Sequence, residues 1–151
     1  FSLADFIGPK NDFLGLFALT TGHGLEKLVS EFEEQNDDYN VIMAKVIADR
    51  LVEAFAERMH ERVRTEFWGY AENETMKNED LIKERYQGIR PAPGYPSCPS
   101  HEEKDLIWKL LDVEKNTGIT LTETRAMSPA ASICGWYFSH PKSRYFFVRE
   151  S

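Results

Sequence analysis

The sequence has 151 residues, of which 42% are hydrophobic and 28% are charged, a balance typical of one globular domain with a substantial core. Its formal net charge of −7 argues against a general nucleic-acid binder, because such a protein needs a net basic surface. No apolar run reaches transmembrane length, and the two cysteines form no CxxC pair. We therefore expect a cytoplasmic protein that binds neither nucleic acid nor membrane.

The first predicted elements are two short strands and a helix. Residues 3–10 and 12–21 are predicted as strands on either side of a turn at Pro9, the second because its apolar run suits a buried central strand. Apolar residues then recur at helical spacing from Leu25 to about Gln35, which indicates an amphipathic helix.

The strongest helix pattern extends from Asp38 to about Phe67, with Asp37 or Asp38 as its cap. Its last third, residues 57–64 (ERMHERVR), is charged and is predicted to face solvent. The predicted core-facing stripe consists of Val41, Ile42, Val46, Ile47, Leu51, Val52, Phe55, Met59 and Val63.

Two further helices are predicted around a proline-rich loop. The first is capped by Asn78 and ends near Tyr86. The second begins with a capping box, in which Ser100 is followed three residues later by Glu103, and ends near Gly118.

The last part of the chain is predicted to be β-structure. Residues 119–124, 132–139 and 144–149 are rich in β-branched and aromatic residues, and a turn at 139–143 would join the last two strands as a hairpin. Strands, then helices, then strands is the order of an α+β fold. We expect an antiparallel β-sheet with long flanking helices.

The loop between the two later helices, residues 84–101 (ERYQGIRPAPGYPSCPSH), is stiff and sparsely charged. Its four prolines fix their own φ angles and favour extended neighbours, while Gly94 allows close approach to the backbone. Arg90 could hold a ligand carboxylate with two hydrogen bonds, and Tyr95 offers a ring and a hydroxyl. Alternatively, the loop is a rigid connector in which Arg90 pairs with an internal carboxylate.

Four segments of the sequence resemble one known family in the same order along the chain. They are FSLADFIGPK, residues 37–64 (DDYNVIMAKVIADRLVEAFAERMHERVR), residues 90–104 (RPAPGYPSCPSHEEK) and residues 126–148 (AMSPAASICGWYFSHPKSRYFFV). The family is the activation domain of cobalamin-dependent methionine synthase. The resemblance covers essentially the whole chain, so we expect residues 1–151 to be a single domain, a fragment that lacks the N- and C-terminal extensions of the family's domain.

The resemblance implies an enzyme domain that binds S-adenosylmethionine and supports reductive methylation of cob(II)alamin to methylcobalamin. Its expected partners are the cobalamin-binding domain of the same enzyme, which holds the cobalamin, and a flavodoxin or flavoprotein reductase. The alternative is a non-catalytic module that docks on a corrinoid protein and its reductase. The isolated fragment is not expected to run the methionine reaction alone.

The resemblance also implies a set of contacts to S-adenosylmethionine. The family's arginine maps to Arg90, and a carboxylate of the long helix maps to Glu53, for which the alternative is a buried partner of an internal arginine. The implied ligand-binding set is Glu53, Arg90, Ala92, Gly94, Tyr95, Tyr145 and Phe146. An acidic ligand contact near the family's N-terminus has no counterpart here, and Phe146 lacks the hydroxyl that its family position often carries.

Two other clusters have simpler explanations. Cys98 and His101, with Cys134 or His140, could be imagined as a metal site, but His101 belongs to a predicted helix cap and His140 to a turn. A group of basic residues could form a docking patch for an acidic electron donor or a solvated helix face, which we favour. This basic group consists of Arg58, Arg62, Arg64, Lys83 and Arg85.

Overall fold

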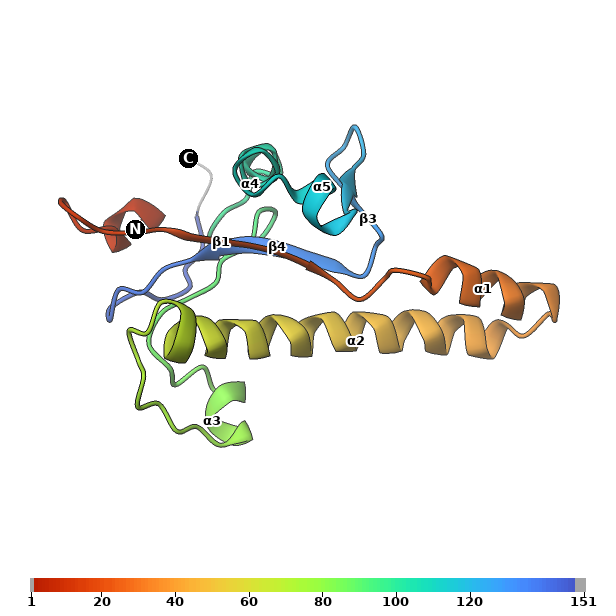
Figure 1. Ribbon diagram of the computed structural model, residues 1–151, viewed down its shortest axis with the longest axis horizontal. Coiled ribbons are helices and arrows are strands. Elements are labelled where there is room, and N and C mark those ends of the chain that lie inside the picture. Colours follow the sequence, from red (N-terminus) through yellow and green to blue (C-terminus); the bar gives the residue numbers. More distant parts are fainter. Residues whose placement is uncertain (1, 149–151) are drawn as a thin grey trace.

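The computed structural model describes residues 2–148 and has the predicted α+β architecture (Figure 1). Its helices are α1 (Leu25–Glu34), α2 (Asp38–Arg62), α3 (Asn78–Ile82), α4 (Glu103–Leu111) and α5 (Val113–Thr117), with a 3-10 turn η1 (Leu3–Phe6) and a π-helical turn η2 (Val63–Phe67). Its strands are β1 (Gly15–Thr20), β2 (Thr120–Leu121), β3 (Met127–Ser128) and β4 (Ser132–Tyr137). Within the described residues, no helix combines the length and apolar character needed to cross a membrane.

The central sheet pairs β1 with β4 in antiparallel register, so that Gly15 lies opposite Tyr137 and Thr20 opposite Ser132. The short strands β2 and β3 form a separate antiparallel pair. The proline-rich loop starts against β4, because Ile89 forms an antiparallel bridge with Phe138 and the Trp136 N–H donates to the Pro91 carbonyl at 3.0 Å. The backbone around Arg90 is therefore held against β4.

Helices cover both faces of this sheet, with α2 on one side and α4 and α5 on the other (Figure 1). On the α2 side, Phe17, Leu19 and Tyr137 pack against Val52 and Ala56. The opposite core contains Ile107, Val113, Ile119, Cys134 and Trp136. A strand buried on both faces has no polar side, which explains the apolar run of β1.

The two ends of the described chain differ from the prediction of strands. Residues 3–6 form η1, whose start is fixed by a capping box between Ser2 and Asp5. No strand or hairpin forms over residues 144–148; this segment lies against the proline-rich loop, where the Val148 N–H donates to the Pro96 carbonyl at 3.0 Å. Arg149, the last residue of the predicted strand, lies outside the described residues.

The helix predicted between Ser100 and Gly118 is two helices. Asp112 has a left-handed backbone (φ 48°), which ends α4 and starts α5, while Gly118 ends α5 as predicted (φ 71°). The predicted capping box is wrong, because Glu102 occupies the N-cap position and the Ser100 hydroxyl accepts only the Glu102 N–H.

Helix α3 is shorter than predicted. It starts at Asn78 with Lys77 at the N-cap, and it ends at Ile82 rather than near Tyr86. The left-handed backbone at Glu84 (φ 49°) excludes a helix that continues through this residue.

Helix α2 begins where predicted, with the Asp37 carboxylate accepting the Asn40 N–H. The predicted stripe is largely wrong, because five of its members are exposed: Ile42, Val46, Ile47, Leu51 and Phe55. The buried residues of α2 are Val41, Ala48, Val52, Ala56 and His60. The sheet therefore packs against a different face of α2, which is rich in small residues.

Candidate functional site

A cavity of about 290 Å³ lies between α2, β1, β4, the proline-rich loop and the segment after His140. Six of the seven predicted ligand-binding residues line this cavity: Glu53, Arg90, Ala92, Tyr95, Tyr145 and Phe146. These residues come from three distant parts of the sequence, and the fold brings them together. Gly94, the seventh, is not among the lining residues.

Gly94 instead allows the tight turn that shapes the loop. Its φ angle is +93°, and its N–H donates to the Cys98 carbonyl at 2.8 Å. A Cβ atom at this position would lie 2.2 Å from Cε1 of His101. Any other residue would therefore be strained and would displace the His101 ring.

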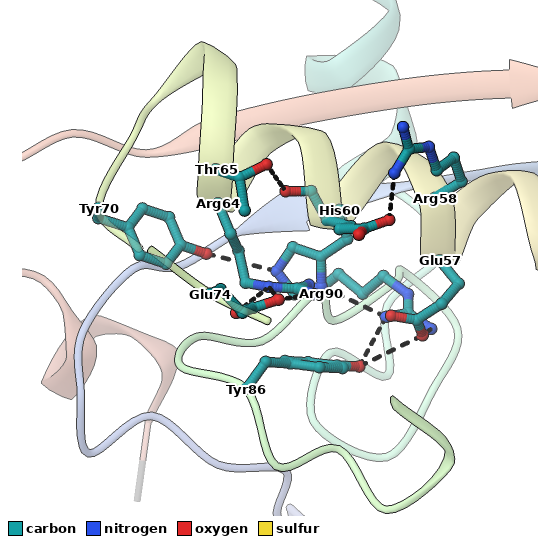
Figure 2. A network of polar contacts seen from close by, with 10 residues as sticks. Glu57, Arg58, His60, Arg64, Thr65, Tyr70, Glu74, Tyr86 and Arg90 are labelled. Carbon is teal, nitrogen blue, oxygen red and sulfur yellow. Dashed lines mark hydrogen bonds and ion pairs between the residues drawn. The ribbon is translucent and has the colours of Figure 1, made fainter. Parts of the chain in front are cut away.

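The guanidinium of Arg90 is held by three groups (Figure 2). Its Nη2 lies 2.9 Å from Oε2 of Glu57, and its Nη1 donates to the Tyr86 hydroxyl at 2.8 Å and lies 3.3 Å from Nδ1 of His60. Arg90 therefore pairs with an internal carboxylate, as the connector interpretation expected, and it also lines the cavity.

Glu53 and Glu57 occupy successive turns of α2 and have different environments. Glu57 pairs with Arg90, whereas Glu53 is exposed and lines the cavity. The alternative interpretation of Glu53 as a buried partner of an arginine is therefore wrong, since Glu57 has that place. A carboxylate at Glu53 remains available to a cationic group in the cavity.

Tyr145 contributes to the cavity wall and also anchors the loop. Its hydroxyl accepts the Arg90 backbone N–H at 3.1 Å, and burial raises the pKa of this phenol. Ser97 forms a second anchor, because its hydroxyl donates to the Phe146 carbonyl at 2.6 Å and accepts the Phe146 N–H at 3.0 Å.

Two fully buried polar residues, His60 and Arg64, belong to the same polar network as Arg90 (Figure 2). Arg64 donates to both carboxylate oxygens of Glu74, and its guanidinium lies 3.9 Å from the centre of the Tyr86 ring. The prediction that residues 57–64 form a solvated face is therefore wrong at these two positions. In the sequence, only their spacing indicates burial, because His60 and Arg64 follow Ala56 by four and eight residues and so lie on the same helix face.

The family model for the activation domain of vitamin B12 dependent methionine synthase matches residues 1–150. The chain belongs to this family. The activation domain is also similar to a crystal structure of the MetH reactivation domain bound to AdoHcy, with 60% sequence identity and a TM-score of 0.94. The match covers 96% of this chain and 46% of that chain, so the activation domain described here spans less than half of the length of that relative. The similarity confirms the predicted fold.

In the activation domain, His60 is neutral. Its burial, together with Arg64 and Arg90, lowers the pKa of the imidazole to about 2. Nδ1 faces the cationic Nη1 of Arg90, so Nδ1 accepts and the proton lies on Nε2, 3.4 Å from the Tyr70 hydroxyl. The ring is stacked on Tyr137, with 5.1 Å between the ring centroids.

We expect the stability of the activation domain to fall as the pH is lowered from 7 to 5, partly because of His60. The unfolded chain binds a proton at His60 below about pH 6.5, whereas the folded chain does not until about pH 2. From His60, the free energy of unfolding should therefore fall by about 2 kcal/mol in total between pH 7 and pH 5, and the slope should approach about 1.4 kcal/mol per pH unit below pH 6. Urea unfolding at several pH values gives the free energy of unfolding of the native chain and of His60→Gln. The native chain should take up one more proton on unfolding than the variant, so its free energy of unfolding should depend more steeply on pH.

Because His101 is exposed and lies outside the buried cluster, His101→Gln provides the control substitution. Parallel stability profiles for the native chain and His60→Gln would contradict a neutral, buried His60.

Three of the basic residues are exposed at the surface, whereas both cysteines are at least partly buried. Within residues 2–148, no three histidine, cysteine, aspartate or glutamate residues are grouped to hold a metal ion. Burial raises the pKa of the Cys98 thiol, and it raises that of Cys134 to about 11. Arg58, Arg62 and Arg85 are paired with neighbouring carboxylates at the surface, whereas Arg64 is buried.

Proposed function

We propose that this chain is the S-adenosylmethionine-binding part of a reactivation domain, which supports the reductive methylation of cob(II)alamin to methylcobalamin in cobalamin-dependent methionine synthase. The observation that carries the proposal is the cavity, which gathers an arginine, a carboxylate and aromatic side chains in a member of this family. The similar MetH reactivation domain was crystallised with AdoHcy, which is S-adenosylmethionine without its transferable methyl group.

The chemistry of the cavity matches the parts of this ligand. We assign the ligand carboxylate to Arg90, whose guanidinium is a strong donor to carboxylates, and the cationic ammonium or sulfonium to the exposed Glu53. Tyr145 and Phe146 supply ring surface for the adenosine. Ala92 and Tyr95 line the cavity along the loop, and Gly94 gives the loop its shape.

The reaction requires positioning more than acid–base catalysis. The sulfonium carries a good leaving group, the neutral thioether. When the methyl carbon is transferred, its bond to sulfur breaks and the sulfur keeps the electron pair. Cobalamin, which we assign to another domain of the same enzyme, would supply the nucleophile for the methyl group once it has been reduced by one electron. The residues of this chain would hold the sulfonium in line with that acceptor.

The electron would come from a flavodoxin or flavoprotein reductase. Residues 1–151 would act as a single unit that is completed by further chain in the full domain, in agreement with the 46% coverage of the longer relative. A second candidate function is a docking module with little or no ligand affinity, and the pairing of Arg90 with Glu57 favours it, because this pair already neutralises the guanidinium.

Isothermal titration calorimetry with S-adenosylmethionine distinguishes the two functions. We expect one ligand to bind per chain, in this fragment and in a version extended at both ends. Absence of binding in both proteins would exclude the ligand-binding function and favour the docking module. Binding only in the extended version would show that the cavity of the fragment lacks a necessary contact.

Substitutions of Tyr145 test the wall of the cavity. Tyr145→Phe should weaken S-adenosylmethionine binding by about 0.5–1.5 kcal/mol, because the hydroxyl that fixes the Arg90 backbone is lost. Tyr145→Ala should weaken it clearly more, because the ring surface is lost too. If calorimetry gives the native affinity for Tyr145→Ala, Tyr145 does not belong to the binding site.

A further inference from the structure

Arg90 lines the cavity, but the groups that hold its guanidinium do not. Glu57, His60 and Tyr86 contact the guanidinium, and none of the three is among the residues that line the cavity. Arg90 therefore belongs both to the cavity wall and to a polar cluster, which Figure 2 shows. An arginine side chain has four rotatable bonds, so the orientation of its planar fork depends on such contacts.

The three contacts come from two elements that are themselves fixed. Glu57 and His60 are one turn apart on α2, and the ring of His60 lies edge-on to Tyr86 with 5.1 Å between centroids. The guanidinium of Arg64 also lies over the ring of Tyr86, and it is held there by its ion pair with Glu74. The cluster is rigid because each partner of Arg90 has a second partner.

The Tyr86 hydroxyl is the central atom of this arrangement. It accepts from Nη1 of Arg90 at 2.8 Å and lies 3.5 Å from Oε2 of Glu57, the same oxygen that contacts Nη2 of Arg90. Burial raises the pKa of Tyr86 to about 12, so the hydroxyl keeps its proton at neutral pH and can donate to the carboxylate. The Tyr86 oxygen thus accepts from Arg90 while its proton points to Glu57. The guanidinium is held between two acceptors, the Tyr86 hydroxyl and the Glu57 carboxylate.

We infer that Tyr86, together with Glu57 and His60, positions the Arg90 guanidinium for the carboxylate of the ligand. Tyr86 acts through Arg90 and does not touch the ligand. It is therefore a positioning residue for the amino-acid part of the ligand, and it has no role for the adenosine part. This inference rests on the proposed function, because it assigns the ligand carboxylate to Arg90.

The test compares two ligands that differ in the amino-acid part, using calorimetry on the full chain. S-Adenosylhomocysteine has that part, whereas 5′-methylthioadenosine keeps the adenosine and the thioether and lacks it. Tyr86→Phe should lower the affinity for S-adenosylhomocysteine about three- to tenfold, because the guanidinium loses one of its fixed acceptors. The affinity for 5′-methylthioadenosine should stay unchanged.

A double-mutant cycle then separates positioning from general stability. On an Arg90→Ala background, Tyr86→Phe should have no further effect on S-adenosylhomocysteine binding. Tyr39→Phe is the control: it removes the hydroxyl of an exposed tyrosine in the first turn of α2, and it should leave both affinities unchanged.

The outcomes distinguish this inference from the proposed function. Equal losses for both ligands in Tyr86→Phe, or the same loss with and without Arg90, would overturn positioning while leaving the site intact. An unchanged affinity of Arg90→Ala for S-adenosylhomocysteine, or no binding of either ligand to both the native chain and its version extended at both ends, would overturn the proposed site and this inference with it.

Discussion

Replacing Arg90 with alanine should weaken S-adenosylmethionine binding by about 2–4 kcal/mol, as measured by calorimetry. A carboxylate in the cavity would lose a charge-assisted partner, and such hydrogen bonds contribute more than neutral ones. Arg90→Lys should restore only part of the affinity, because an ammonium group cannot match the planar fork that now reaches Glu57, Tyr86 and His60 together. An unchanged affinity in Arg90→Ala would remove Arg90 from the site.

The substitution also affects the folded protein, since Glu57 would lose its ion-pair partner. Thermal unfolding of Arg90→Ala without ligand therefore has to accompany the titration. A variant that remains folded and binds weakly supports the contact with the ligand. If the variant is already unfolded at the temperature of the titration, its weak binding would reflect unfolding instead.

Glu74→Ala should destabilise the protein by about 3–5 kcal/mol, the largest stability loss that we expect from a single substitution here. The side chain of Arg64 is 0% exposed and that of Glu74 is 6% exposed, so the variant would leave a buried, uncompensated positive charge. Urea unfolding with a two-state analysis would give the change in the free energy of unfolding.

Glu66→Ala is the matched control for this effect. Glu66 also pairs with an arginine, Arg62, but 46% of its side chain is exposed and water can replace the lost contact. Its loss of stability should be far smaller than that of Glu74→Ala. Similar losses in the two variants would show that burial does not determine the importance of the Arg64–Glu74 pair.

The sequence predicts elements well where one periodicity dominates. The apolar run of β1 and the spacing from Leu25 onward each led to an element close to the observed one. The prediction failed for the buried face of α2, because apolar residues surround the first half of this helix and cannot indicate which side the sheet covers. Only tertiary packing selects the face with Ala48, Val52 and Ala56.

In the candidate site, too, some features are predicted from the sequence and others are not. Its residues were expected from a family resemblance, and the fold gathers six of them around one cavity. The sequence does not predict the contacts that hold the Arg90 guanidinium, because charged residues are rarely buried and residues 57–64 have the composition of a solvated face. The segment at 144–148 has the composition of a strand, but its partners are the hydroxyl of Ser97 and the Pro96 carbonyl rather than a neighbouring strand.

The contact of residues 144–148 with the proline-rich loop has a consequence for the order of folding. One wall of the cavity is provided by Tyr145 and Phe146, which are distant in sequence from Glu53 and Arg90. Contacts between distant residues require closure of long chain segments, and they form late. During synthesis, the sheet partner β1 and the long helix α2 leave the ribosome well before the segment that completes the cavity. The cavity wall is therefore completed only after Tyr145 and Phe146 have been synthesised and have packed against the proline-rich loop.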